Sequence, residues 1–251
     1  MNNLIRMIST DGTLSIMAVD STNIVTEMQH IHSTLKVCSA ALGRLLTASS
    51  LMGASLKGDN DSITVKINGK GPCGTVLGVS DSKGNVRGYI GNAHINLPLN
   101  NKGKLDVSGA IGTDGFLTVI KDLGLKEPYI GQVPIVSGEI AEDITSYYAT
   151  SEQTPSVCAL GVLVDPDSES IICAGGFIIQ LLPSADDEAI SNVENDIKAI
   201  KPVTTMLFEK MSPKDICRAV LPSFELEVLD ESEVEYRCNC SKDRVAKALI
   251  A

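Results

Sequence analysis

Two cysteines near the end of the chain, Cys238 and Cys240, are the residues whose type and spacing could do chemistry. In an extended chain, side chains two positions apart point to the same side, so both thiolates can reach one ion or one reaction partner. Three chemistries are open: part of a four-thiolate zinc site, a strained and labile local disulfide, or the active pair of a thiol-disulfide oxidoreductase. Two unconnected surface thiols are the remaining interpretation. The nearby basic residues Arg237, Lys242 and Arg244 would favour the thiolate form in all three chemistries.

The other residues that could take part in chemistry show no comparable pattern. Five cysteines stand singly among apolar or small neighbours, which is typical of small core residues: Cys38, Cys73, Cys158, Cys173 and Cys217. The histidines His30, His32 and His94 suggest no catalytic triad, and we expect ordinary surface or core roles for them. We therefore expect no catalytic residue among them, and no enzyme activity unless Cys238 and Cys240 act as the oxidoreductase pair.

Two glycine-rich nucleotide motifs can be checked directly in the sequence. GKGPCG at 69–74 matches G-x-G-x-x-G, but a strand-like segment follows it where a dinucleotide site needs a helix, so we expect a plain turn. The sequence has no G-x-x-x-x-G-K-[ST] motif, which argues against an ATP-driven machine.

The composition restricts the partners and the compartment. The 251 residues carry a net charge of -10 without a basic block, so we expect no nucleic-acid partner. We see no signal-peptide pattern, and the longest nearly apolar run, 171–183, is too short to span a bilayer. Seven irregularly spaced cysteines fit reduced thiols better than a disulfide framework. These features predict a cytoplasmic protein without a membrane partner.

The elements that must position the thiol pair begin with a mixed domain over residues 1–183. NLIRMIS and TLSIMAV flank Asp11-Gly12, a strong hairpin signal, and SITVKIN alternates as a half-buried strand should. Residues 38–58 are small and apolar all round, which predicts a buried helix that ends at Gly58, and residues 138–148 have helical spacing. Because the strands come as hairpins, we predict an α+β fold, with an antiparallel-sheet core domain and buried helices.

Residues 184–235 are predicted to form an acidic helical linker. Residues 186–235 hold 13 acids and five bases. Ser184 is predicted to cap a helix that Pro202 ends, and Ser212-Pro213 marks the start of another. Helices with so narrow an apolar stripe depend on docking for their stability. The third region, residues 236–251, holds the thiol pair and is predicted to be a partial zinc-binding tail.

The end of the sequence bears on the choice between the chemistries. Ser241 is of a residue type that often caps the start of a helix. Val245, Ala248 and Leu249 begin the apolar face of such a helix, and the sequence stops at Ala251 without a cap or a helix-breaking residue. We therefore expect an interrupted chain, with two further ligands beyond Ala251. This favours Cys238 and Cys240 as half of a metal site.

Segments along nearly the whole chain resemble one family. They are CSAALGRLLTASSLMGASLKG (38–58), GTVLGVSDSKGNVRGYI (74–90), LTVIKDLGLKEPYIGQVPIVSGEIAEDIT (117–145), SEQTPS (151–156), AGGFIIQLLPSA (174–185) and YRCNCSKDRV (236–245). The chain closely resembles the 33 kDa chaperonins, the redox-regulated heat-shock holdases of bacteria. The resemblance implies a globular core, a helical linker and a zinc domain in which Cys238 and Cys240 supply two of four zinc thiolates. The other two come from a downstream C-x-x-C in the family, a pair that this sequence lacks.

The resemblance also implies a function. It predicts an ATP-independent chaperone that holds unfolding or aggregating client proteins under oxidative stress. Oxidation of the Cys238 and Cys240 thiols to a disulfide would release zinc, undock the linker and expose apolar surface. A homodimer is left open. The alternatives are a thiol-disulfide oxidoreductase that uses Cys238 and Cys240, and a zinc-dependent interaction module without a redox role.

Overall fold

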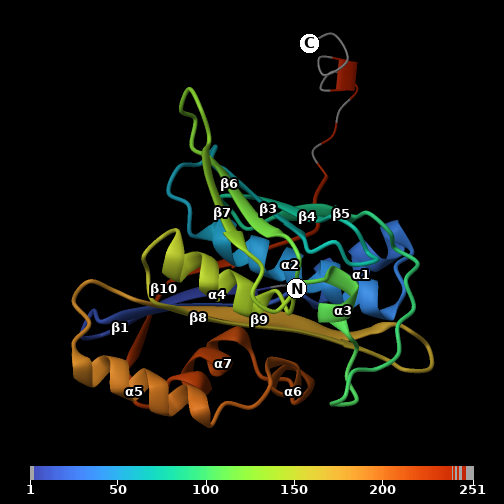
Figure 1. The fold of residues 1–251 in the computed structure, drawn as a ribbon. Coiled ribbons are helices and arrows are strands. Elements are labelled where there is room, and N and C mark those ends of the chain that lie inside the picture. The colour runs from blue at the N-terminus through green and yellow to red at the C-terminus, as the bar shows by residue number, and fades with distance from the viewer. Residues whose placement is uncertain (1–2, 239, 241, 243–244, 247–251) are drawn as a thin grey trace.

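The computed structural model describes residues 3–238, 240, 242 and 245–246. In this part of the chain, ten strands form two antiparallel sheets, and helix α2 (Lys36–Ala54) lies between them (Figure 1). We call the sheet of order β10-β1-β2-β9-β8 sheet A and the sheet of order β5-β4-β3-β6-β7 sheet B. The predicted α+β class with an antiparallel-sheet core is confirmed.

The strands of sheet A come from both ends of the chain: β1 (Asn3–Ser9), β2 (Leu14–Asp20), β8 (Ser156–Val164), β9 (Ile171–Leu181) and β10 (Leu226–Glu233). Those of sheet B come from its middle: β3 (Ser62–Asn68), β4 (Val76–Asp81), β5 (Val86–Ile90), β6 (Phe116–Asp122) and β7 (Tyr129–Pro134). Besides α2, the described helices are α1 (Thr22–His32), α3 (Val107–Ile111), α4 (Ala141–Thr150), α5 (Asp187–Lys198), α6 (Val203–Phe208) and α7 (Pro213–Val220).

Helix α2 is buried by both sheets because its side chains are small. A Cβ atom on Gly43 would lie 2.8 Å from Val25, and one on Gly53 would lie 2.2 Å from the Ser80 hydroxyl, so only glycine permits these approaches. Its buried hydroxyls bond to backbone carbonyls, as Ser49 does to Leu45 at 2.8 Å. By length and composition α2 is the one described helix that could cross a membrane. In its most apolar 18-residue stretch, 89% of the residues are buried inside the protein.

Most elements predicted for the core are found, and their ends differ locally. The hairpin around Gly12 and the strand over 62–68 are confirmed, and residues 69–74 form a turn. The predicted end of α2 at Gly58 is wrong, because the helix ends at Ala54 and Asp61 accepts a hydrogen bond from the Gly58 amide in a separate turn. Helix α4 begins three residues later than predicted, after Ile140, whose φ of 69° is not helical.

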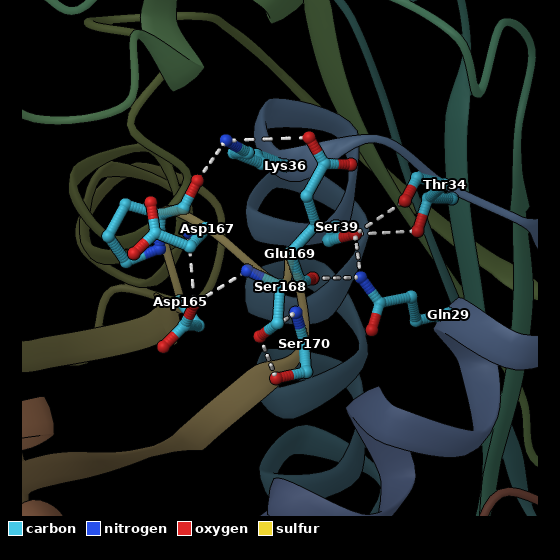
Figure 2. A network of polar contacts seen from close by, with 10 residues as sticks. Gln29, Thr34, Lys36, Ser39, Asp165, Asp167, Ser168, Glu169 and Ser170 are labelled. Carbon is cyan, nitrogen blue, oxygen red and sulfur yellow. Dashed lines mark hydrogen bonds and ion pairs between the residues drawn. The ribbon is translucent and has the colours of Figure 1, made fainter.

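The tip of the β8–β9 hairpin is fastened to the junction of α1 and α2 (Figure 2). Gln29 donates to the Glu169 carbonyl at 2.7 Å, and the Lys36 ammonium donates to the Pro166 carbonyl at 2.6 Å. The Lys36 ammonium also lies 3.4 Å from the Glu169 carboxylate. These contacts fix sheet A to the buried helix independently of the linker region.

Residues 184–225 return to sheet A and cover its outer face with α5, α6 and α7 (Figure 1). The predicted cap Ser184 is wrong: Asp186 caps α5 by accepting from the Ala189 amide, while the Ser184 hydroxyl donates to the Gly12 carbonyl. The Ser212 cap of α7 is confirmed. Strand β10 was not predicted, because its acidic and mostly exposed residues show no alternation; the strand forms by backbone pairing with β1. The division into 1–183, 184–235 and 236–251 stays a prediction.

Candidate functional site

The thiol pair follows the last strand, β10, after the four residues 234–237, and is open to solvent. Both Cys238 and Cys240 are exposed. Among the described residues, no group of three or more His, Cys, Asp or Glu side chains could hold a metal ion. Arg237 lies 3.8 Å from Glu235 with both side chains more than half exposed, a pair that contributes little stability. Arg244, also expected to favour thiolate, lies outside the described residues.

The segment just before the thiol pair, residues 234–237, joins the two sheets, and we call it the strap. The Val86 amide of β5 donates to the Glu235 carbonyl at 3.0 Å, and the Arg237 amide donates to the Val86 carbonyl at 2.7 Å. These two bonds make a parallel bridge between Val86 and Tyr236 at the edge of sheet B. The strap therefore leaves β10 in sheet A and attaches to sheet B before it reaches Cys238.

Tyr236 provides the side-chain part of this attachment. Its hydroxyl lies 3.0 Å from His32 Nε2 and donates to the Gly88 carbonyl at 3.1 Å, while the Gly88 amide approaches it at 3.4 Å. The Tyr236 and His32 rings meet edge to face, with centroids 6.3 Å apart. Burial raises the pKa of the Tyr236 hydroxyl, the Gly88 hydrogen bond opposes this, and the Cys238 thiol adds a smaller rise. One side chain thus links α1, β5 and the thiol pair.

Val234 anchors the other end of the strap. It is 3% exposed and lies over Gly84 in the β4–β5 turn, where a Cβ atom would come within 2.9 Å of Val234 and 3.3 Å of Leu4. Gly84 also has a φ of 84°, which favours glycine. Beside the strap is a cavity of about 650 Å³, lined also by Asn23, Ile24 and Glu27 of α1. The strap is therefore held by a few defined contacts and is not packed on all sides.

The other cysteines lie where the sequence predicts, in or against the core. Cys38, Cys73, Cys173 and Cys217 are buried, and Cys158 is partly buried. Burial raises the pKa of all five thiols, to about 12 for Cys73 and Cys217. They stay protonated at neutral pH, so they are poor nucleophiles.

A second apolar surface lies under the linker helices. The outer face of sheet A and α5–α7 share a cluster separate from the one around α2, and we call it the linker core. Its buried members are Ile5, Met7, Leu14, Ile16, Ala18, Cys173, Phe177 and Ile179 of sheet A, with Val193, Val203, Met206, Leu207, Ile216, Cys217, Val220 and Leu221 of the linker. Gly175 of β9 permits close approach, because a Cβ atom there would lie 2.7 Å from Leu207.

Sequence reasoning identified the thiol pair but not its anchors. Tyr236 and His32 are separated by 204 positions, so their contact could not be predicted from spacing. The one available signal was an aromatic residue with a polar tip two positions before Cys238.

Comparisons with known proteins cover the whole chain. The family model described as Hsp33 protein matches residues 2–251. A 33 kDa chaperonin of Clostridioides difficile is 49% identical over 248 residues, covering 99% of this chain and 84% of its own. A 33 kDa chaperonin of Oceanobacillus iheyensis is 48% identical over 247 residues, covering 98% of this chain and 85% of its own. The crystal structure of the 33 kDa chaperonin of Thermotoga maritima superposes with a TM-score of 0.89 at 36% identity, covering 99% of this chain and 84% of that one.

Proposed function

Because this chain belongs to the Hsp33 family, we propose that it is an ATP-independent holdase, a chaperone that binds unfolding proteins and is controlled by oxidation of its thiol pair. The observation that carries the proposal is the linker core. It is an apolar face of a folded sheet that, within the part of the chain the structure describes, is covered by helices α5, α6 and α7 and the segments between them. A surface of this kind can bind exposed apolar segments of other proteins once the cover moves.

The linker helices are suited to move because they depend on docking. Helices α6 and α7 have six and eight residues, below the length at which an isolated helix is stable in water. Their stability comes from buried side chains such as Leu207 and Ile216, each of which contributes about 1.5–3 kcal/mol. When the linker undocks, clients with apolar segments take over the contacts it leaves, and ATP is not required.

Oxidation is the proposed trigger. Cys238 and Cys240 are exposed, whereas burial raises the pKa of the other five thiols, so an oxidant reacts first with the pair. Hydrogen peroxide would take two electrons and two protons from the pair, forming one disulfide and two waters. A disulfide across one intervening residue is strained, and strained disulfides are the readily reduced, regulatory kind. The switch is therefore reversible.

Zinc fits this pair only in part. A structural zinc site takes four ligands, and the described residues around Cys238 and Cys240 supply no third. Zinc would be held by these two thiolates together with two ligands from elsewhere, and it would then stabilise the fold of the segment around them. The two thiolates alone would bind zinc weakly, and the oxidation step above needs no metal.

The test is light scattering from a heat-aggregating client enzyme without ATP. We expect the peroxide-treated protein to suppress aggregation at near-stoichiometric amounts and the reduced protein to suppress it much less. The double variant Cys238→Ser/Cys240→Ser is the matched control and should not respond to peroxide. Equal client protection before and after peroxide would refute redox control, and no protection in either state would refute the holdase. Insulin reduction that is lost in the double variant would instead support the oxidoreductase.

A further inference from the structure

The strap, residues 234–237, is the covalent connection between the thiol pair and the linker helices. In chain order, α7 is followed by β10, then by the strap, and then by Cys238. The strap continues from β10 of sheet A and touches sheet B twice, through Val234 over Gly84 in the β4–β5 turn and through Tyr236 beside Val86. The strap is therefore the covalent route along which a change at Cys238 can reach β10 and the linker.

The hold on sheet B is strong and local. It includes the two backbone hydrogen bonds to Val86 and the bond from the Glu235 amide to the Asn85 side chain at 3.3 Å. The Tyr236 hydroxyl adds three polar contacts with His32 and Gly88. The Arg237 amide that bonds to Val86 belongs to the residue directly before Cys238. Neighbouring Cα atoms are about 3.8 Å apart across a fixed peptide bond, so Cys238 cannot move far without displacing Arg237.

The connection to sheet A runs through β10, which pairs with β1 from Asn3↔Glu233 to Ser9↔Leu226. Strand β10 is an edge strand whose side chains are mostly exposed, and its register with β1 shifts between Arg6 and Met7. Between the buried Leu221 at the end of α7 and the start of β10 at Leu226 lie four residues. Once Tyr236 and Val234 are released, only the pairing with β1 keeps β10 in place. Loss of that pairing would free β10 and the four residues that join it to α7.

We propose that the strap is a latch that transmits the oxidation state of Cys238 and Cys240 to the linker, with Tyr236 as its positioning residue. This inference rests on the proposed function and specifies its regulation. Formation of the disulfide, with peroxide reduced to two waters, closes a small ring and changes the backbone next to Arg237. The 2.7 Å bond from Arg237 to Val86 is lost when the amide moves beyond about 3.5 Å. The Tyr236 contacts then break, and the linker undocks.

Amide hydrogen exchange measures how often the strap opens. The Val86 amide donates to the strap, so its exchange rate reports strap opening. Val65, fully buried in the central strand of sheet B, is the internal control. Peroxide treatment should speed exchange at Val86 by roughly 5- to 30-fold, the effect of losing one or two hydrogen bonds, and should leave Val65 unchanged.

The Tyr236→Phe variant tests the latch without changing either thiol. It keeps the ring and removes the hydroxyl, so the reduced variant should show faster Val86 exchange and should suppress client aggregation several-fold better than the reduced wild type. Tyr89→Phe, which removes the hydroxyl of a half-exposed tyrosine on the same strand, is the matched control and should do neither. His32→Ala is a second variant that leaves Tyr236 in place and should speed Val86 exchange to a smaller extent.

The outcomes distinguish the latch from the function on which it rests. If peroxide activates the wild type while Val86 exchanges equally in both states, the latch is wrong and the redox-controlled holdase stands. If Tyr236→Phe and His32→Ala both leave Val86 exchange unchanged, Tyr236 does not hold the strap. If client binding is the same in reduced and oxidised wild type, the proposed redox control fails, whatever exchange at Val86 shows.

Discussion

Shortening Ile216 to alanine is the most direct way to weaken the linker without touching a thiol. Ile216 lies on α7, is 1% exposed, and belongs to the linker core. Truncating a buried isoleucine removes about 2–5 kcal/mol, from the lost burial and from the cavity that remains. Because α7 packs on β1 and β2 of sheet A, this energy comes from docking. The docked fraction should fall by roughly 30-fold or more relative to the open one.

The assay compares reduced Ile216→Ala with reduced wild type in client light scattering and in the fluorescence of an apolar dye. We expect the variant to protect the client and to bind dye without peroxide. Ile144→Ala is the matched control, because Ile144 is equally buried on α4 but belongs to the cluster around α2. It should lower the melting temperature without activating the protein. If Ile216→Ala also melts earlier but remains inert towards client and dye, the covered face of sheet A is not the client-binding surface.

Two further predictions concern titratable groups. Burial raises the pKa of the Glu152 carboxyl, but hydrogen bonds from Lys121 and Tyr147 outweigh it and hold the pKa below its ordinary 4.5. Because the pKa is lower in the folded state, the Glu152 carboxylate stabilises the protein above pH 4.5, and this stabilisation is lost as the pH falls through the folded-state pKa. The melting temperature should therefore fall less steeply between pH 6 and pH 3 for Glu152→Gln than for the wild type. Parallel plots of melting temperature against pH would contradict this. Titration of the native reduced protein with a thiol reagent should give two fast thiols, Cys238 and Cys240, with the other five reacting only after unfolding; a third fast thiol would contradict the assigned burial.

The sequence predicts those features whose determinants are local. The strand over 62–68 follows from alternation, and the α7 cap follows from Ser212 and Pro213. The cap of α5 was wrongly assigned to Ser184 because that hydroxyl bonds to Gly12, 172 positions away, a contact that no local rule contains. Strand β10 was missed for a similar reason, since its stability comes from backbone pairing with β1 at the other end of the chain.

The same division applies to the candidate site. The C-x-C spacing alone singled out Cys238 and Cys240 as a candidate pair for thiol or metal chemistry, and that role stays a prediction. What connects the pair to the rest of the molecule is the contact of Tyr236 with His32 and Gly88, which depends on how the sheets pack. The sequence could therefore suggest a chemistry at the end of the chain, but the proposed connection from the thiol pair to the linker could be inferred only from the folded structure.

Sheet A separates the two apolar clusters, and this separation would let the linker undock, as proposed, without unfolding the core. Along β9, Ala174 and Ile178 belong to the cluster around α2, whereas Phe177 and Ile179 belong to the linker core. Undocking α5–α7 exposes the second face of the sheet and leaves the first one packed, with the β8–β9 tip still fastened to α1 and α2. A holdase needs this arrangement, because its binding surface must be apolar when open and yet belong to an element that stays folded. In the proposed function, the cost of exposing the linker core would be offset by the client's own apolar segments, which become exposed when proteins unfold.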